Sequence, residues 1–416
     1  MRSTIEQLHR KLHKRWVPKW YDAFCDRESG GFHERLGHNF KPVETGYKRL
    51  LTQCRQLAVY AYASQIQGGL DYSDTLGAQI DFMTCHYQGK FKGSWRFSTD
   101  YKGRPYDNRY DLYAHAFVIF TFCHLDRAMP DLGVKEYADQ TLDFIEHAFR
   151  LHDAPGFAEA LDEKGGVIPG MIRRQDPHMH LFEACLFAYE NWEEQRYLDM
   201  AAQILILFED YFIHGEQSDL VEYFDDRLRP HPDCGKQVKP GHYFEWVWLL
   251  QKYMCLSNSR LARLEKLSDK LLEKGNVIGW DKIYGGIYDL CDHNGKVLEE
   301  TKRIWPFAEA LKANAMMLDH LPDRQALKDR MADMVEVFEK GYIQDRGFWT
   351  ETLARDLSPV SDVMPGTTPY HLYFGIEETL DYLKQRGASK SMISGAAGMI
   401  YSLRRGISGA FRALKP

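Results

Sequence analysis

The chain consists of long stretches in which apolar residues recur at helical spacing, separated by short loops rich in glycine and polar residues. One such stretch contains Ile80, Phe82 and Met83, and another spans residues 142–149. Apolar positions three or four residues apart lie on one face of a helix. The pattern therefore predicts a mostly helical chain in which helices alternate with loops.

Six similar loop segments divide the chain into repeats of nearly equal length. In each segment a small or turn residue precedes an apolar residue, and the apolar positions are 63, 62, 63, 67 and 61 residues apart. Several carry an acidic residue two places later, followed by turn-forming sequences such as DEKGG or DHNGK that favour hairpins or extended loops. The six segments are Gly31-Phe32, Ser94-Trp95, Gly156-Phe157, Asp219-Leu220, Gly286-Ile287 and Gly347-Phe348.

Prolines mark the start of one helix in several repeats. Pro177, Pro240, Pro306 and Pro369 are 63, 66 and 63 residues apart, and proline suits a first helical turn because its missing N–H has no intrahelical partner there. The helices that follow are apolar on more than one face, whereas the others have a charged face. Six helix pairs of one length predict an all-α (α/α)6 barrel, with the proline-led helices inside, the others outside, and short β-hairpin loops at one rim.

The repeats end near residue 390, so we expect a catalytic barrel domain over residues 1–390. Residues 391–416 are rich in glycine and alanine and have a basic end. They are expected to form a tail, helical in part, that covers the barrel base or a partner surface. No stretch reaches the roughly 18 apolar residues that a membrane span requires, and the first residues do not resemble a secretory signal.

Charge and cysteine usage narrow the class of protein. The 53 basic and 59 acidic residues are well mixed and give a net charge of -6, which offers no basic field for nucleic acid. The eight cysteines include no C-x-x-C pair, as is typical of a reducing compartment. We therefore expect a cytoplasmic protein with a small-molecule substrate, no nucleic acid, no stable membrane insertion, and a homodimer as the default assembly.

Ionisable side chains recur near the start of the inner helices, so a closed ring brings them to one mouth. A single histidine at a helix start is usually a structural hydrogen-bonding group, and a buried glutamate can be a capping partner. Histidines that follow the repeat favour a shared site instead, and any buried carboxylate must be paired. The expected cavity is lined by His115, His180, His242, His371, Arg55, Glu245 and Glu309.

No pattern indicates a metal or a nucleotide. His178 and His180 are two residues apart, so on a regular helix they point in different directions and cannot chelate one ion. The chain has no H-E-x-x-H, G-x-G-x-x-G or Walker sequence. We expect neither a metal ion nor a cofactor.

Neutral histidine suits removal of a proton beside a carbonyl group, because its ordinary pKa near 6.5 leaves it largely unprotonated at cellular pH. Two histidines on opposite sides of a substrate can remove and return a proton. Arg55 could stabilise the developing enediolate oxygen.

Six motifs at these residues resemble the N-acylglucosamine 2-epimerase superfamily, which also contains cellobiose 2-epimerases and mannose or sulfoquinovose isomerases. The likeness covers roughly residues 5–385, and the element P-G-H-x-x-E-W is its most telling mark. The motifs are RLLTQCRQ (49–56), DLYAHAF (111–117), DPHMHLFEA (176–184), PGHYFEW (240–246), RIWPFAEA (303–310) and TPYHLYF (368–374).

The resemblance implies a metal-free (α/α)6 barrel in which His242 and His371 form the acid/base pair around C1, C2 and the ring oxygen. It implies that His180 takes part in catalysis by binding and polarising the sugar. Position 176 is often asparagine in relatives, so the contact made by Asp176 is left open. The substrate-binding residues expected beside these are Arg55, His115, Asp176, Glu245, Trp305, Glu309 and Tyr110.

The spelling of the P-G-H-x-x-E-W and P-Y-H-L elements resembles the mannose-isomerase branch. We therefore expect aldose–ketose isomerisation of the mannose-to-fructose type through a cis-enediolate. A sugar 2-epimerase of the N-acylglucosamine or cellobiose type is the alternative, since it differs only in the face of C2 to which the proton returns. A glycoside hydrolase, which requires two flanking carboxyl groups, and a non-catalytic sugar-binding scaffold are the remaining readings.

Overall fold

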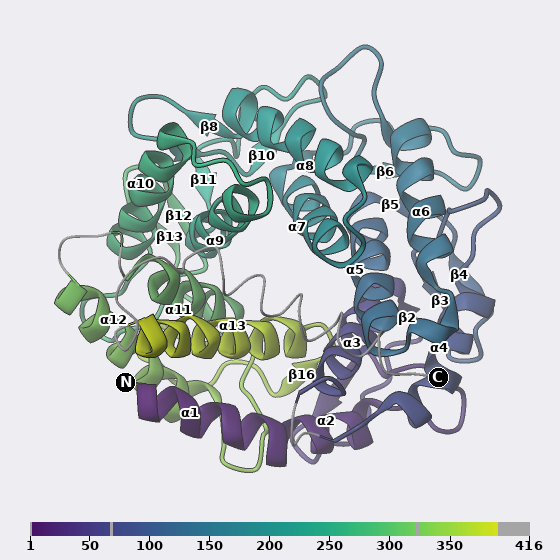
Figure 1. Ribbon diagram of the computed structural model, residues 1–416, viewed down its shortest axis with the longest axis horizontal. Coiled ribbons are helices and arrows are strands. Elements are labelled where there is room, and N and C mark those ends of the chain that lie inside the picture. The colour runs from purple at the N-terminus through teal and green to yellow at the C-terminus, as the bar shows by residue number, and fades with distance from the viewer. Residues whose placement is uncertain (1, 67–69, 319, 321–323, 390–416) are drawn as a thin grey trace.

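Two concentric rings of helices make up the protein, with strands and loops joining them (Figure 1). The computed structural model describes residues 2–66, 70–318, 320 and 324–389, and the expected tail at 391–416 lies outside them. The inner ring is formed by α3 (Leu50–Ala63), α5 (Leu112–Ala128), α7 (Gln175–Trp192), α9 (Pro240–Leu256), α11 (Trp305–Met317) and α13 (Thr368–Ser389). The predicted (α/α)6 barrel is confirmed.

The outer ring surrounds these helices, and its members share a charged face. It is formed by α1 (Arg2–Lys11), α2 (Val17–Phe24), α4 (Ser73–His86), α6 (Lys135–Phe144), α8 (Gln195–Leu207), α10 (Ala262–Ile278) and α12 (Arg324–Val337), with a short 3-10 helix η2 (Pro130–Leu132) between α5 and α6. Single π-helical turns join α1 to α2 and extend α6, α8 and α12: η1 (Leu12–Trp16), η3 (Ile145–Phe149), η4 (Phe208–Phe212) and η5 (Phe338–Tyr342).

The sixth helix pair is made by the two ends of the chain. The N-terminal helix α1 packs against α13, the last inner helix, so within the described residues α1 takes the outer place beside α13 (Figure 1). The hairpin residues close the ring as well, because β1 (Arg35–Gly37) pairs antiparallel with β16 (Val363–Pro365).

Short antiparallel strands connect neighbouring repeats. Pairs are formed by β5 (Tyr110–Asp111) with β6 (Ala160–Leu161), β7 (Arg173–Arg174) with β10 (Tyr223–Phe224), β8 (Ile213–His214) with β9 (Asp219–Leu220), and β14 (Lys302–Arg303) with β15 (Thr352–Leu353). Three-stranded sheets are formed by β2 (Lys48–Arg49), β3 (Ser98–Thr99) and β4 (Pro105–Asp107), and by β11 (Gln237–Val238), β12 (Leu290–Asp292) and β13 (Val297–Glu299). Each such strand leads directly, or within a few residues, into an inner helix or a hairpin turn.

The six loop segments of the sequence repeat have one structural role. The apolar residue of each forms an antiparallel bridge to the end of the preceding outer helix, as Phe157 does with Arg150 and Ile287 with Trp280. In the sixth repeat the bridge to Ile343 is made by Trp349 rather than by the expected Phe348. The repeat is therefore real, with a shift of one residue in its last copy.

The inner helices are buried on nearly every face, which explains why their sequences are apolar and aromatic all round. Every residue of α5 from Ala114 to Leu125 is buried. Among the described residues, no helix combines the length and the apolar character needed to cross a bilayer.

Candidate active site

Three inner helices bring His180, His242 and His371 around one carboxyl group. Glu245 Oε1 lies 3.9 Å from Nε2 of His180, and its Oε2 lies 3.8 Å from Nε2 of His242. Glu245 also forms a group with Glu309 and His371 in which one ligand atom of each lies within 4.8 Å of the others. Residues as many as 191 positions apart therefore converge at the starts of α7, α9, α11 and α13.

A buried carboxylate orients His242. Nδ1 of His242 lies 2.9 and 2.8 Å from the two carboxylate oxygens of Glu222, at the end of the preceding hairpin. Gln175 donates from Nε2 to Glu222 at 3.1 Å and accepts from the indole of Trp246 at 2.8 Å, which fixes the carboxylate in turn. With Nδ1–H donated to Glu222, Nε2 of His242 faces the cluster as an acceptor.

The second histidine, His371, has a similar arrangement. Its Nδ1 lies 2.8 Å from Glu309 Oε1, and Lys312 lies 2.7 Å from the other oxygen of that carboxylate. Burial lowers the pKa of His371 to about 4, and the hydrogen bond to Glu309 opposes the shift only in part. His371 is therefore neutral near pH 7, with Nε2 free to accept a proton.

The third histidine is charged instead. Nδ1 of His180 lies 2.9 Å from Glu183, and Nε2 lies 3.4 Å from Asp176. Although burial disfavours the imidazolium, hydrogen bonds to Asp176 and Glu183 raise the pKa of His180 to about 9. Tyr370 donates a short hydrogen bond to Glu183 and completes this network. His180 is thus suited to donate a hydrogen bond rather than to act as a base.

The neighbouring carboxyl groups of Glu245 and Glu309 differ in protonation state. Burial and the neighbouring Glu309 raise the pKa of Glu245 well above its ordinary value, whereas Lys312 and His371 outweigh burial and lower the pKa of Glu309. Glu245 is the protonated member. Its buried Oε2 has no hydrogen-bond partner within the described part of the chain, so it is available to a ligand.

Arg55 is held by aromatic rings. It donates from Nη2 to the hydroxyl of Tyr113 at 2.6 Å, and its guanidinium carbon lies 4.3 Å from the ring centre of Phe117 and 4.7 Å from that of Tyr370. Its buried Nε has no hydrogen-bond partner among the residues described. A buried guanidinium N–H without a partner is costly unless a ligand supplies an acceptor.

Trp305 lies close to both His242 and His371. Its ring centre is 5.1 Å from that of His242 and 5.5 Å from that of His371, and its side chain is only partly buried. Two partly exposed guanidinium groups lie beside residues of the site: Arg303 is 5.6 Å from the ring centre of Trp305, and Arg174 is 3.9 Å from Asp176. These residues mark the side from which a polar ligand can reach the histidines.

Two expected site residues lie elsewhere. His115 is fully buried; its Nε2 accepts from the backbone N–H of Trp95 at 3.0 Å, and its Nδ1 lies 2.8 Å from the carbonyl of Asp111. Tyr110 packs against His115 and Phe144 in the same interior, away from the cluster. The structure therefore does not bring His115 and Tyr110, which were expected to line the cavity, to the cluster.

The reason is that the repeats align differently from the expected register, by two residues. His115 corresponds to His178, not to His180, because Nε2 of His178 accepts from the backbone N–H of Phe157 in the same way. Gln53 and Tyr243 receive the equivalent backbone N–H in two other repeats, at 2.7 and 3.3 Å. Both ring nitrogens of His115 are thus used to hold a loop.

The sequence did not assign roles to Glu222, Lys312 and Tyr113. The signal for Glu222 was present, since it is the acidic residue that recurs two places after the apolar loop position. Lys312 follows Glu309 by three residues, which places the two side chains on one helix face. Nothing in the local sequence distinguishes Tyr113 from an ordinary core tyrosine.

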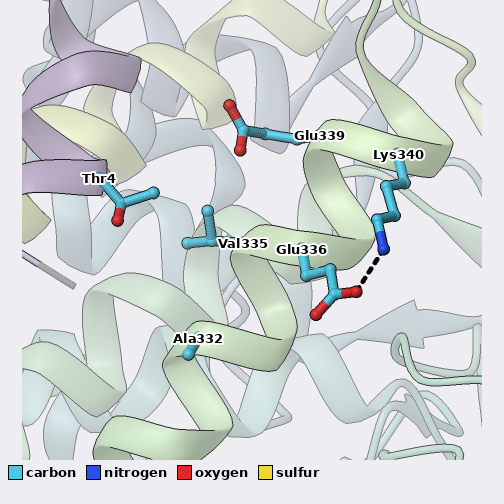
Figure 2. A pocket seen from close by; sticks show the side chains of 6 residues that line it. All are labelled: Thr4, Ala332, Val335, Glu336, Glu339 and Lys340. Atoms are coloured by element: carbon cyan, nitrogen blue, oxygen red, sulfur yellow. Dashed lines mark hydrogen bonds and ion pairs between the residues drawn. The ribbon is translucent and has the colours of Figure 1, made fainter.

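A separate hollow on the outer surface lacks these features. It is lined by Thr4 of α1 and by residues of α12 and η5, namely Ala332, Val335, Glu336, Glu339 and Lys340 (Figure 2). Its polar contact is the ion pair of Glu336 and Lys340, four residues apart on one helix. Its lining contains no histidine and therefore lacks the imidazoles that the cluster brings together.

The model of one known family matches this chain. The N-acylglucosamine 2-epimerase (GlcNAc 2-epimerase) family matches residues 30–375. The chain belongs to this family. It is an enzyme of the isomerase and epimerase kind that this family contains, and those enzymes act on sugars.

Relatives with full-length similarity include isomerases and epimerases. A protein of Rhizobium meliloti (strain 1021), named mannose-6-phosphate isomerase, is 30% identical over 89% of this chain and 95% of its own length. The structure of cellobiose 2-epimerase from Bacillus thermoamylovorans B4167 is similar with a TM-score of 0.83 and 19% identity, covering 92% of this chain and 100% of that one. A D-mannose isomerase structure gives a TM-score of 0.80 at 19% identity, over 92% and 98% of the two chains. At these identities the structural matches establish the fold.

Proposed function

We propose that the protein is an aldose–ketose isomerase that converts mannose, or a close analogue such as its 6-phosphate, to the corresponding ketose without a metal ion. The observation that carries the proposal is the pairing of two histidines, His242 and His371, each with one ring nitrogen held by a buried glutamate and the other facing a shared cluster. Such an imidazole has a defined tautomer and a free basic nitrogen, as proton abstraction beside a carbonyl requires.

In the proposed reaction Nε2 of His371 takes the proton from C2 of the open-chain aldose. The electron pair of that C–H bond forms the C1–C2 double bond of a cis-enediolate, and the carbonyl oxygen O1 becomes negative. Return of the proton to C1, with transfer of the O2 proton to O1, converts the C1–C2 double bond to the C2 carbonyl and gives the ketose. His242 assists ring opening by moving the proton between the ring oxygen and O1, and the roles of the two histidines are exchangeable in this scheme.

Three groups are suited to stabilise the developing charge. His180 carries a positive charge, Arg55 has an N–H without a partner among the described residues, and Glu245 is a protonated acid with an oxygen that likewise has none. Donors placed before the reaction where negative charge develops are a large term in catalysis. A hydroxyl-rich ligand also supplies hydrogen-bond partners to Arg55 and Glu245.

The similarity to the Rhizobium meliloti protein named mannose-6-phosphate isomerase supports mannose as the sugar. The partly exposed guanidinium groups of Arg174 and Arg303 at the mouth suit either a sugar hydroxyl or a phosphate. Both the free and the phosphorylated sugar therefore belong in the substrate test.

A 2-epimerase is the second candidate. His242 and His371 lie on either side of Trp305, so a sugar resting against that ring could meet a base on each face of C2. Return of the proton from the opposite face inverts C2 and gives the epimer. The same assay separates the two outcomes.

The test is incubation in D2O with mannose, mannose 6-phosphate, glucose, cellobiose and N-acetylglucosamine, followed by NMR. Formation of a ketose supports isomerisation, and an epimer with deuterium at C2 supports epimerisation. Neither product and no exchange on any sugar would contradict the proposal. We expect His242→Ala and His371→Ala each to lower turnover by about 10²–10⁴-fold.

His115→Gln is the matched control. Gln53 already receives the equivalent backbone N–H in the first repeat, so glutamine can replace the structural role of His115. Turnover should remain within about two-fold. A loss as large as that of His371→Ala would return His115 to the active site.

We also propose a metal-free site in a cytoplasmic protein. The atoms of Glu245, Glu309 and His371 are close enough to hold a cation, so activity after dialysis against EDTA is the decisive measurement, with retained turnover expected. The eight cysteines all lie within the described residues and form no disulfide there, which suits a reducing compartment. A homodimer is the expected assembly, to be checked by light scattering.

A further inference from the structure

A second cluster of ligating side chains lies away from the active site, where the two ends of the chain meet. His9 of α1 and His13 of η1 are four residues apart, and Glu377 of α13 faces both of them. Nε2 of His9 lies 2.9 Å and Nε2 of His13 lies 2.5 Å from the same oxygen, Glu377 Oε1. The proposed reaction uses none of these groups.

From this geometry we infer a binding site for a divalent transition-metal ion, Zn²⁺ by its ligand set, formed by His9, His13 and Glu377. One ligand atom of each residue lies within 4.8 Å of the others. Around a tetrahedral ion with ligands at about 2.0–2.2 Å the ligand atoms are about 3.3–3.5 Å apart. The imidazoles therefore need to move from the carboxylate by only about 1 Å or less to admit the ion.

The helix geometry places the two imidazoles where both can bind one ion. Residues four apart lie on one helix face, and the rings of His9 and His13 have centres 4.5 Å apart. This spacing differs from that of His178 and His180, which point in different directions. Two histidines and one carboxylate leave a fourth position open for water, as in three-ligand zinc sites.

A neighbouring polar group also points to a ligand. The ring of Tyr373, one turn before Glu377 on α13, lies edge-on 5.4 Å from that of His13. Its hydroxyl is buried and has no hydrogen-bond partner among the described residues. A metal-bound water beside the cluster would give that hydroxyl a partner. His9 remains partly exposed, which provides a path for the ion.

The ion would form a bridge between the N-terminal helix α1 and the last inner helix, α13. These two helices form the sixth pair, the only pair in the described structure whose members come from opposite ends of the chain. No loop joins them, so a metal bridge supplies the connection that a short loop provides in the other pairs. The site would act on stability and leave the proton-transfer chemistry unchanged.

The test starts from full-length protein that has been treated with EDTA and then desalted. Binding of Zn²⁺ is measured by calorimetric titration, and the titration is repeated with Co²⁺ while the visible spectrum is recorded. We expect one ion per chain, a Co²⁺ absorption typical of four-coordinate sites, and a rise in Tm with Zn²⁺. His9→Gln, His13→Ala and Glu377→Gln should each weaken binding at least ten-fold and abolish the rise in Tm. His9→Gln, at the partly exposed position, is the variant least able to disturb folding.

Two matched controls separate this site from other histidines. His147 lies in the equivalent π-helical turn η3 without a second histidine four residues earlier, so His147→Ala should bind Zn²⁺ as the parent does. His371→Ala should also retain binding, which excludes His371 of the active-site group as a ligand. Absence of binding at micromolar Zn²⁺, or full binding by His13→Ala and Glu377→Gln, would overturn the proposal and identify the cluster as a metal-free hydrogen-bonded one.

Discussion

The third and fourth repeats use one carboxylate position for two purposes. In the third, Glu159 accepts the backbone N–H of Arg174 at 3.1 Å and binds its guanidinium Nε at 2.6 Å. In the fourth, Glu222 accepts the equivalent backbone N–H, that of Lys239, also at 3.1 Å, but its oxygens are bound by His242. The scaffold contact is the same, and only its second partner differs.

The first and fifth repeats follow the third. Glu34 binds the backbone and Nε of Arg49, and Asp289 binds those of Arg303. Lysine at position 239 lacks the planar fork that engages a carboxylate in two places. Replacing arginine by lysine in one repeat thus leaves the carboxylate free to orient a histidine.

The charge state of the two carboxylates differs as well. Burial raises the pKa of Glu159 to about 7, even beside Arg174. Burial acts to raise the pKa of Glu222 as well, but the nearby His242 and Lys239 outweigh burial, so the pKa of Glu222 is lowered. In the proposed reaction an ionised Glu222 can stabilise the imidazolium that forms when His242 takes up a proton, which is the task of a positioning carboxylate.

Of the substitutions that test this comparison, Glu222→Gln should have the largest effect on kcat. A neutral amide cannot stabilise the imidazolium, and its NH2 group can donate to Nδ1 and reverse the tautomer of His242. We expect kcat to fall on the order of 10²-fold with KM changed much less. Steady-state kinetics on the preferred sugar would measure the split.

Glu159→Gln is its control, at the equivalent position. It should leave kcat within about two-fold and shift the free energy of unfolding by about 1 kcal/mol, because the amide oxygen can still accept the Arg174 backbone N–H. Equal losses of kcat in both variants would show that the carboxylate acts only through the fold.

A contrast of the same kind occurs within helix α7, between His178 and His180. Burial and the nearby Arg173 lower the pKa of His178 to about 3, and it serves the loop; His180 has a pKa of about 9. As pH rises through 9, His180 loses its charge, so kcat/KM should fall about ten-fold per unit above that pH. A pH profile from 6 to 10.5 would measure this limb.

Glutamine at position 180 provides the check. His180→Gln should have lower activity throughout but no alkaline limb near 9, because the titrating group is gone. Persistence of the same limb in that variant would assign it to another residue. The circular dichroism spectrum across the range must stay constant for the comparison to hold.

Much of this arrangement follows from the sequence because it is repeated. The loop spacing and the helix-initial prolines predict the two rings, and they bring His180, His242, His371, Arg55, Glu245 and Glu309 to one place. A repeat fixes which helix carries a residue, but an error of two positions turns a side chain to another face. His115 and Tyr110 accordingly lie apart from these six residues.

Other parts depend on contacts that a linear reading does not contain. Glu222 meets His242 only because a hairpin folds the chain back over 20 residues. The sixth pair of helices requires the two ends of the chain to meet, so α1 could not be assigned as its outer member from periodicity alone. The protonation of Glu245 depends on Glu309 from a different helix.

Lys239→Arg makes the fourth repeat resemble the third and should have the smallest effect. An arginine here can place its guanidinium on Glu222, as Arg174 does on Glu159, and compete with Nδ1 of His242 for the same oxygens. We expect kcat to fall about three- to ten-fold while the free energy of unfolding stays equal or rises, since a carboxylate–guanidinium pair is gained. Kinetics and denaturant unfolding of the one variant measure both quantities. Stability and activity are then expected to move in opposite directions. A fall in both would indicate general disruption of the fold. An unchanged kcat would show that Glu222 holds His242 too firmly for a guanidinium to displace it.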